Sequence, residues 1–321
     1  LCHGSRQYSS TYVLVRFLDC RPFLASDELN EFIQESASYR GCFFDTMSSL
    51  MAHIVSVVNQ KGGVGKSTTA VNLGAYLAHL GKYVLIVDLD PQGNASSGLG
   101  HDIANMKGTY EVIAGMHPAK ELIAKTDHDG LDILIANQNL AGASVELVSE
   151  LNRERKLHQA LLEVRNDYDY ILIDNPPSLG LLTINGLVAA DSVLIPVQAE
   201  YFALEGLGQL MQTVQLIQES IKPELKIIGA VITMFDPRTK LSRAVLEELY
   251  RHFPDKIFRS VIPRTVRLAE APSYGKSILH YDPSSKGSKA YERLAKEFLQ
   301  REELHAQQAA QQEEMGSAIG S

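Results

Sequence analysis

The residues best suited to chemistry stand in one short stretch, V57-V-N-Q-K-G-G-V-G-K-S-T68. Glycines let consecutive backbone N–H groups converge on phosphate oxygens. Lys66 supplies a positive charge for the β- and γ-phosphates of a nucleotide, and the Ser67 hydroxyl is a ligand for Mg²⁺. The stretch therefore predicts a phosphate-binding loop whose contacts come from Lys61, Gly62, Gly63, Val64, Gly65, Lys66, Ser67 and Thr68.

This loop departs from the common pattern G-x-x-x-x-G-K-[ST] at its first position. Gln60 stands where the first glycine is expected, and an extra lysine, Lys61, precedes the glycines. The dinucleotide pattern G-x-G-x-x-G fits worse, because Thr68 occupies its third glycine position. We interpret the stretch as a nucleotide-phosphate site whose extra lysine has a role of its own.

Three aspartates stand at the ends of two predicted strands. V84-L-I-V-D-L-D-P-Q-G93 carries Asp88 and Asp90, and Y170-I-L-I-D-N-P-P-S178 carries Asp174. Ligands of open α/β sheets gather at the carboxyl ends of strands, so these carboxylates can serve one metal ion and one water. We expect Ser67, Asp88 and Asp174 at Mg²⁺, with Asp174 acting through a water.

Asp90 lies just past its strand, where it could orient the attacking water, and with Lys66 it is a candidate catalytic residue. The alternative is an ordinary turn or helix-capping aspartate, because such residues are common after strands.

Short β-branched runs alternate with helical patterns from residue 53 onward. Nearly continuous apolar runs predict strands buried on both faces, at 54–58, 83–88, 131–136, 170–174, 192–197, 226–233 and 257–262. Helices are predicted at 66–80, 155–165, 204–221 and 241–252. This alternation predicts an α/β fold, a mostly parallel twisted sheet flanked by helices.

Composition divides the chain into three parts. Residues 1–50 form an irregular, aromatic-rich extension that we interpret as preceding the native start, with translation beginning at Met47 or Met51. Residues 51–302 form the nucleotide-binding domain, and 303–321 form a Gln/Ala-rich polar tail expected to be a fraying helix.

Overall composition narrows the class of protein. Of 321 residues 45% are hydrophobic and 21% charged, which is ordinary for a soluble globular protein. No apolar run approaches the roughly 18 residues of a membrane span. The cysteines, Cys2, Cys20 and Cys42, all precede the main body, so we expect a cytoplasmic protein without a disulfide framework or a cysteine-bound cluster there.

Charge is distributed unevenly along the chain. The net charge of −8 argues against nucleic-acid binding, yet residues 236–301 hold 14 Lys/Arg and 8 Asp/Glu. This locally basic segment could dock on an anionic polymer. It could equally be a solvated helical face, and charge alone leaves both interpretations open.

Four motifs together resemble the ParA/Soj chromosome- and plasmid-partitioning ATPases, a deviant Walker A class that also includes MinD. They are N59-Q-K-G-G-V-G-K-S-T68, D88-L-D-P-Q-G-N94, D174-N-P-P-S-L-G180 and I262-P-R-T-V-R-L-A-E-A-P-S273, and the resemblance runs from about residue 52 to 298. It implies the fold of the P-loop NTPases with a ParA-type domain over 51–302. It also implies ATP and Mg²⁺ as cofactors and hydrolysis of ATP to ADP and phosphate.

The resemblance also implies partners. In this family the extra lysine, here Lys61, reaches the phosphates held by a second subunit, which implies an ATP-dependent homodimer and a catalytic role for Lys61. It implies non-specific binding of double-stranded DNA through Arg238 and Arg267, an adenine-side wall at Pro263, and stimulation by a ParB/Spo0J-type centromere-binding protein. A nucleoid-associated cytoplasmic protein without a membrane partner is expected.

Two positions depart from the family pattern. Asn175 stands where cysteine is usual, beside the expected Mg²⁺ carboxylate, and Thr265 stands where asparagine is usual.

Other members of the class remain as alternatives. A MinD-like division-site ATPase needs a C-terminal amphipathic helix with a basic face, whereas this chain ends in H305-A-Q-Q-A-A-Q-Q312. A biosynthetic enzyme such as a cobyrinate or dethiobiotin synthetase, or a scaffold that keeps ATP as a structural ligand, would use the same loop.

Overall fold

The computed structural model describes residues 51–319 apart from 105, 201–202 and 255. Our interpretation of residues 1–50 lies outside the described residues. The domain limits at 51 and 302 stay predictions, and helix α14 (Lys286–Ile319) runs across the second of them without a break.

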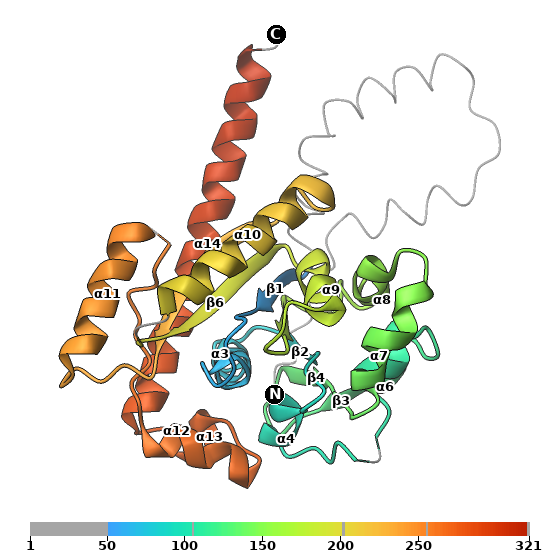
Figure 1. Cartoon of the computed structure of the whole chain (residues 1–321), viewed down its shortest axis with the longest axis horizontal. Helices are drawn as coiled ribbons and strands as arrows, with labels where there is room; N and C mark the ends of the chain where they lie inside the picture. The colour runs from blue at the N-terminus through green and yellow to red at the C-terminus, as the bar shows by residue number, and fades with distance from the viewer. Residues whose placement is uncertain (1–50, 105, 201–202, 255, 320–321) are drawn as a thin grey trace, which may run out of the picture. The chain divides into compact units, whose positions relative to one another are not determined.

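Within the described part, seven strands form one sheet in the order β3-β4-β2-β5-β1-β6-β7 (Figure 1). Every neighbouring pair is parallel except β3–β4. The predicted mostly parallel α/β sheet is therefore confirmed. The strands are β1 (His53–Val57), β2 (Val84–Asp88), β3 (Ile123–Lys125), β4 (Leu131–Leu134), β5 (Tyr170–Asp174), β6 (Ser192–Gln198) and β7 (Lys226–Thr233).

Register aligns the ends of the three central strands. Asp174 of β5 pairs with Val57 of β1 on one side and with Asp88 of β2 on the other. Three loops therefore leave the sheet at the same level, from its carboxyl edge, and the residues at their starts are brought together.

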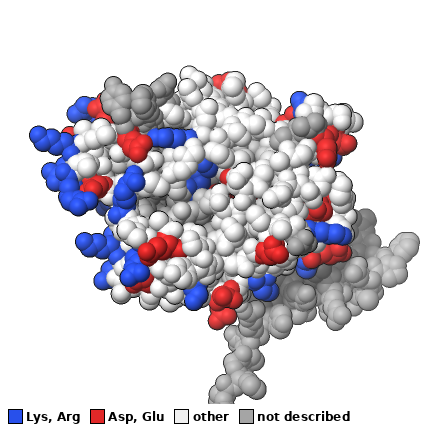
Figure 2. Space-filling view, turned by 60° about the horizontal axis from the view of Figure 1, so that its bottom comes forward, with Lys and Arg blue, Asp and Glu red and all other residues white. Residues whose placement is uncertain are grey.

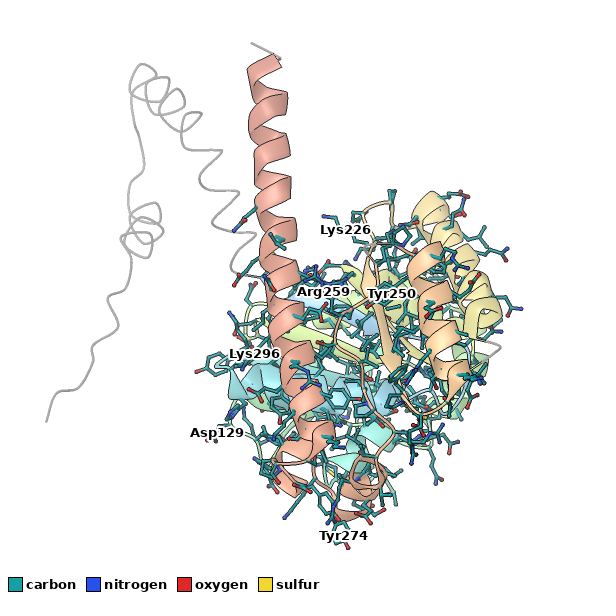
Figure 3. The ribbon with its side chains drawn as sticks, turned by 90° about the vertical axis from the view of Figure 1, so that its left-hand side faces the viewer. Asp129, Lys226, Tyr250, Arg259, Tyr274 and Lys296 are labelled. Atoms are coloured by element: carbon teal, nitrogen blue, oxygen red, sulfur yellow. The ribbon has the colours of Figure 1, made fainter. Side chains whose placement is uncertain are left out.

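Alternate strand residues enter two cores, one on each face of the sheet. Ile171 and Ile173 belong to one core and Leu172 to the other. Helices α8 (Lys156–Leu161), α9 (Leu181–Ala189) and α10 (Ala203–Ser220) contribute to the first core. Helix α3 (Lys66–His79) and α14 contribute to the second, and Figure 3 shows α14 passing along one side of the sheet with Lys296 projecting from it. Burial on both faces explains why the strands read as continuous apolar runs.

Shorter helices fill the connections. They are α4 (Asn94–Gly98), α5 (Thr109–Ile113), α6 (Ala119–Leu122), α7 (Leu140–Glu146), α11 (Lys240–His252), α12 (Val266–Glu270), α13 (Ile278–Tyr281), and the 3₁₀ turns η1 (Leu147–Ser149), η2 (Arg153–Arg155) and η3 (Ala271–Tyr274).

Some predicted elements were wrong. Residues 257–262 do not form a strand. They cross beside β7 with a single isolated bridge, Ala230 with Ile257, and a second bridge follows between Phe235 and Pro263. Pro263 has no N–H with which to extend a ladder. The edge strand β3 has only three residues and was not predicted, and the helix expected at 155–165 ends at Leu161.

We predict that Phe298→Ala destabilises the fold strongly. Phe298 is fully buried in α14 and its ring packs edge-on against Tyr170 at a centroid distance of 5.5 Å. The expected loss in the free energy of unfolding, measured by denaturant titration, is about 3–5 kcal/mol. Leu304→Ala in the same helix removes a half-exposed side chain and is the control, with an expected change below about 0.5 kcal/mol. Equal effects for the two variants would contradict the docking of α14 described here.

Candidate active site

The loop between β1 and α3 presents its backbone to an anion. Gly63 and Gly65 have φ of +71° and +89°, which side chains rarely tolerate, so glycine is required there. Gly65 caps α3 without a side-chain hydrogen bond. The first N–H groups of the helix therefore remain available to phosphate oxygens, with the positive end of the helix dipole behind them.

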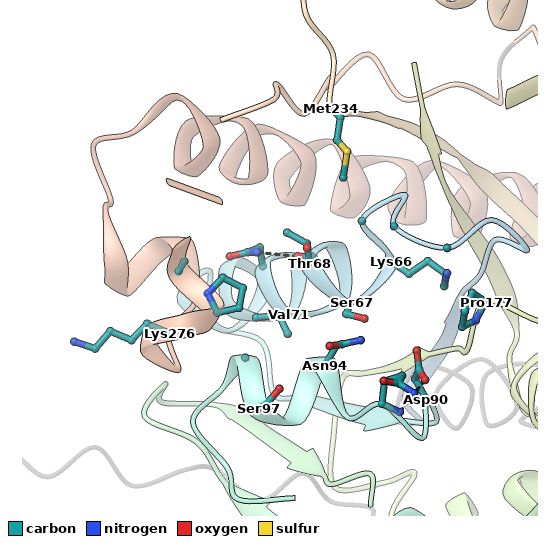
Figure 4. Close-up of a pocket in the computed structure, with 18 residues that line it drawn as sticks. Lys66, Ser67, Thr68, Val71, Asp90, Asn94, Ser97, Pro177, Met234 and Lys276 are labelled. Atoms are coloured by element: carbon teal, nitrogen blue, oxygen red, sulfur yellow. Dashed lines mark hydrogen bonds between the residues drawn. The ribbon is translucent and has the colours of Figure 1, made fainter. Parts of the chain in front are cut away.

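A cavity of about 350 Å³ opens in front of this loop. Figure 4 shows Lys66, Ser67 and Asp90 around the same opening, while Lys276 points away from it. Of the predicted contacts, the lining includes Gly62, Gly63, Gly65, Lys66, Ser67 and Thr68. Val64 is different, because its side chain is buried and its carbonyl accepts a hydrogen bond from Thr233 Oγ1 (2.7 Å).

A second cavity of about 170 Å³ lies next to the first. It shares Gly65, Thr68 and Met234 with the first cavity and is lined mainly by apolar side chains, including that of Pro263. Met234 lies above the loop (Figure 4) and has a φ of +51°, which costs a non-glycine residue about 1–2 kcal/mol. The second cavity therefore offers a largely apolar lining beside the phosphate loop.

Asp174 is the unsatisfied carboxylate of the site. It is fully buried, and neither of its oxygens accepts a hydrogen bond within the described part of the chain. Burial and then the charge of Asp88 raise its pKa well above the ordinary range, against smaller opposing effects of the nearby Ser67 hydroxyl and Lys66. A buried carboxylate without partners beside a hydroxyl fits a divalent cation, because a cation would offset the cost of its desolvation.

The Asp88 carboxylate is hydrogen-bonded within the chain. Its oxygens accept hydrogen bonds from the backbone N–H of Asp90 (3.1 Å) and from the N–H and hydroxyl of Ser96 (2.9 and 2.7 Å). Burial raises its pKa to about 6, despite these hydrogen bonds. Asp88 thus fixes the turn that carries Asp90 and the start of α4, and its predicted contact with a metal stays a prediction.

Asp90 and Lys66 face the cavity from opposite sides. Asp90 is nearly buried and accepts a hydrogen bond from the N–H of Gln92 (3.0 Å). Lys66 Nζ donates to the carbonyl of Lys61 (3.1 Å). Burial lowers the pKa of Lys66, while the charges of Asp174 and Asp90 oppose that shift. The phosphate loop, Lys66 and the carboxylates of Asp90 and Asp174 can together bind a phosphate chain and a water beside it.

Lys61 does not line its own phosphate cavity. Its ammonium group lies 2.7 Å from Glu200 Oε2, and the Lys61 side chain is 40% exposed. Sequence reasoning singled out this lysine but missed Glu200, whose only signal is its position just past an apolar strand. Asn94 and Ser97, which line the cavity, were also missed.

Asn175 ties Asp174 to the strand before the loop. Its Nδ2 donates to Ser56 Oγ (2.8 Å), the Val57 carbonyl (3.0 Å) and the Ile173 carbonyl (3.2 Å). Its Oδ1 has no partner in the described part, and a Cβ placed on Gly186 would lie 2.1 Å from it. Thr265, the other departure from the family pattern, caps α12 through Leu268 N (3.3 Å) and lines the second cavity.

Arg238 and Arg267 lie outside both cavities, on the surface. Arg238 is 87% exposed and forms a two-fold contact with Asp236, through Nε (2.9 Å) and Nη2 (2.7 Å). Arg267 pairs with Glu270 (3.2 Å) and Asp282 (3.4 Å). Figure 2 shows Lys and Arg side chains gathered at the left of one face, the side on which α11 and α12 lie in Figure 1.

None of the helices in the part of the chain described combines the length and apolarity that a bilayer span requires.

Known proteins match this chain over most of its length. Residues 52–227 match the family model described as an AAA domain. The sporulation initiation inhibitor protein Soj of Bacillus subtilis (strain 168) is 53% identical, over 77% of this chain and 98% of the relative. The chromosome partitioning protein ParA of Myxococcus xanthus (strain DK1622) is 49% identical, over 78% and 89%. The crystal structure of cobyrinic acid a,c-diamide synthase from Mycobacterium smegmatis with bound ADP and magnesium has a TM-score of 0.69 and 39% identity, over 77% and 93%.

We predict that Asp174→Asn stabilises the ligand-free protein. Replacing an unpartnered buried carboxylate by a neutral amide of the same shape should raise the free energy of unfolding at neutral pH by about 1–3 kcal/mol. The same substitution should abolish the rise in Tm that ATP and Mg²⁺ give together.

The pH dependence of this effect has a definite sign. An acid whose folded pKa is raised costs stability above that pKa, and the cost disappears as the pH falls towards its ordinary value of 3.8. The difference between Asp174→Asn and the unchanged protein should therefore shrink on acidification. Asp129→Asn, at an exposed aspartate, is the control. A variant less stable than the parent at neutral pH would contradict this account of Asp174.

Proposed function

This chain belongs to the Soj/ParA family of chromosome-partitioning ATPases, and we propose that it segregates DNA by forming an ATP-dependent dimer on it. The protein is an ATPase that uses ATP with Mg²⁺. In the proposed cycle two copies enclose two ATP molecules, bind DNA without sequence preference, and separate after hydrolysis. The observation that carries the proposal is the position of Lys61, in the phosphate loop but turned out of its own cavity.

The residues of one chain divide the work of hydrolysis. Backbone N–H groups of the loop and Lys66 hold the β- and γ-phosphates, and Ser67 with Asp174 would hold Mg²⁺, Asp174 through a water. When bound, Mg²⁺ neutralises charge that develops on the phosphate oxygens. Asp90 orients the water that attacks the γ-phosphorus as the bond to the ADP oxygen breaks. Pro263 covers the base in the second cavity.

Lys61 completes the site of a partner subunit. An ammonium group aimed at the γ-phosphate stabilises transition-state charge, as an arginine finger does. Within its own chain Lys61 is held by Glu200 on the surface, where an incoming subunit can reach it. A site that lacks this lysine until a second copy arrives makes dimerisation a condition for efficient hydrolysis.

The DNA surface is proposed to lie at Arg238 and Arg267. Both are exposed and both fall within the locally basic segment 236–301. Contacts from arginine to backbone phosphates give affinity that depends on salt and tolerates any sequence. We infer that the ATP-bound dimer associates with the nucleoid in this way, and that a ParB/Spo0J-type centromere-binding protein stimulates hydrolysis and release.

The runner-up function is biosynthetic. A solved structure that resembles this chain at 39% identity is described as a cobyrinic acid a,c-diamide synthase. Two relatives described as chromosome-partitioning proteins, from Myxococcus xanthus and Treponema pallidum, are more similar, at 49% and 50% identity. A synthase needs a small-molecule acceptor beside the γ-phosphate and gains nothing from DNA, so DNA dependence separates the two functions. A MinD-like function would instead require membrane lipid.

We predict that Lys61→Ala still binds ATP but loses most hydrolysis, by about 10²- to 10³-fold, because the positive charge that stabilises the transferring phosphoryl group is lost. Lys120→Ala, which removes another exposed lysine, should leave hydrolysis unchanged. Mixing Lys61→Ala with Asp90→Ala should restore hydrolysis in part. In a mixed dimer the subunit that keeps Asp90 receives Lys61 from its partner. Failure of the two variants to complement each other would place Lys61 in its own site.

We also predict that DNA co-sedimentation requires ATP. The protein should co-sediment with duplex DNA of random sequence when ATP is present. It should not co-sediment with ADP or without nucleotide. Arg267→Glu should abolish retention while ATP-dependent dimerisation, measured by light scattering, survives, because the substitution reverses one charge at the proposed phosphate contact. Equal retention in all three nucleotide conditions would refute the cycle, and intact affinity of Arg267→Glu would move the contact elsewhere.

A further inference from the structure

Residues 262–267 connect features that the proposed function treats separately. Pro263 and Thr265 line the second cavity, where the base is proposed to lie. Arg264 reaches towards the counter-ion of Lys61, and Arg267 belongs to the proposed DNA surface. One short segment therefore lines the cavity proposed for the base, lies near the counter-ion of Lys61 and carries a residue of the proposed DNA surface.

Glu200 is shared between two cations. Its Oε2 lies 2.7 Å from Lys61 Nζ, and its Oε1 lies 3.8 Å from Arg264 Nη2. Gln198 Nε2 also donates a hydrogen bond to Oε1. Glu200 is the second residue after β6, at the carboxyl edge of the sheet. The carboxylate thus stands between the phosphate loop and the segment that carries Arg264.

Backbone contacts join Arg264 to the turn of Arg238. The N–H of Phe235 donates to the Ile262 carbonyl (3.0 Å), and the N–H of Arg264 donates to the Phe235 carbonyl (3.1 Å). Asp236, the next residue, holds Arg238 by its two-fold contact. The pKa of Asp236 is lowered to about 2, first by Arg238 and to a smaller extent by Arg264. A continuous path of backbone hydrogen bonds and one ion pair therefore joins Arg264 to Arg238.

The same segment leads into the helix of Arg267. Thr265 accepts the N–H of Leu268 and so begins α12, and Arg267 lies in the first turn of that helix. Both proposed DNA contacts are thus attached to Arg264, one through the bridge at Phe235 and one through the start of α12.

We propose that Glu200 is a positioning residue that couples ATP-dependent pairing of subunits to the DNA surface. In the single chain Glu200 holds Lys61. When Lys61 leaves for the partner's phosphates, Glu200 retains Arg264 as its cationic neighbour, and the contact between them closes. This fixes residues 262–267 and, with them, Arg238 and Arg267. The inference rests on the proposed function, and it gives ATP-dependent DNA binding two defined states with different contacts in each.

The proposal can be tested by the direction in which DNA affinity changes when Glu200 is replaced. Glu200 is a carboxylate near a basic surface, so its removal alone should strengthen binding of a polyanion in every nucleotide state. The coupling predicts the opposite with ATP. The pairs are 40–60% exposed, so each is weak by itself. We accordingly expect Glu200→Gln to reduce ATP-stimulated DNA affinity only about fivefold, near the lower limit of measured couplings.

The experiment compares full-length Glu200→Gln, Arg264→Gln and the double variant with the unchanged protein. DNA affinity is titrated with ATP and with ADP at several salt concentrations, and dimerisation is measured in parallel. Glu200→Gln should dimerise at the same or lower ATP concentration, since Lys61 is no longer retained, yet bind DNA more weakly with ATP. The double variant should bind no more weakly than Arg264→Gln. Glu247→Gln, the same charge change at an exposed position of α11, is the control.

Each outcome decides between the possibilities. Stronger DNA binding by Glu200→Gln with ATP, or losses that add in the double variant, would overturn the coupling. Arg264→Gln could instead lower the slope of DNA affinity against salt concentration by about one phosphate contact, while Glu200→Gln keeps full affinity. That result would make Arg264 a direct DNA contact. If the unchanged protein binds DNA equally in all nucleotide states, the proposed function fails; if only the Glu200 result fails, the proposed function stands.

Discussion

The repulsion between two buried carboxylates on neighbouring strands is the constraint on which the arrangement of the rest of the site depends. Asp88 and Asp174 are opposite each other in the register of β2 and β5, and both are fully buried. Like charges at low dielectric repel strongly, so both cannot be ionised there without compensation. The described part of the chain compensates only one of them. Asp88 accepts three hydrogen bonds, whereas Asp174 accepts none in the described part. A bound cation would compensate the charge of Asp174.

This division of roles leaves Asp174 as the member of the pair that can respond to a bound ligand. Asp88 anchors α4 and the turn of Asp90, so that wall of the cavity is built before any nucleotide binds. Asp174 lies beside Lys66 and Ser67, which ATP and its metal must also contact. Binding energy is therefore available at Asp174, the carboxylate of this pair that accepts no hydrogen bond in the described part. Stability at that position is given up for affinity.

The sequence was most informative where chemistry is local. The phosphate loop is contiguous with the helix after it, Asp88 and Asp174 each end an apolar strand, and six of the predicted loop residues line one cavity. Pairing across long separations was not predictable. Lys61 and Glu200 are 139 residues apart and meet only because β1 and β6 are neighbours in the sheet. The crossing at 257–262 was mistaken for a strand because its β-branched residues pack beside β7 without forming a continuous ladder.

The close approach of Asn175 to Gly186 has a consequence for how the family diverges. The Asn175 amide fills the space that a methyl group at 186 would need, and the departure from the usual cysteine is accommodated by α9 having no side chain there. The two positions therefore form one steric unit. Homologues with alanine or serine at 186 should carry a smaller residue than asparagine at 175, so lineages should exchange these residues as a pair rather than one at a time.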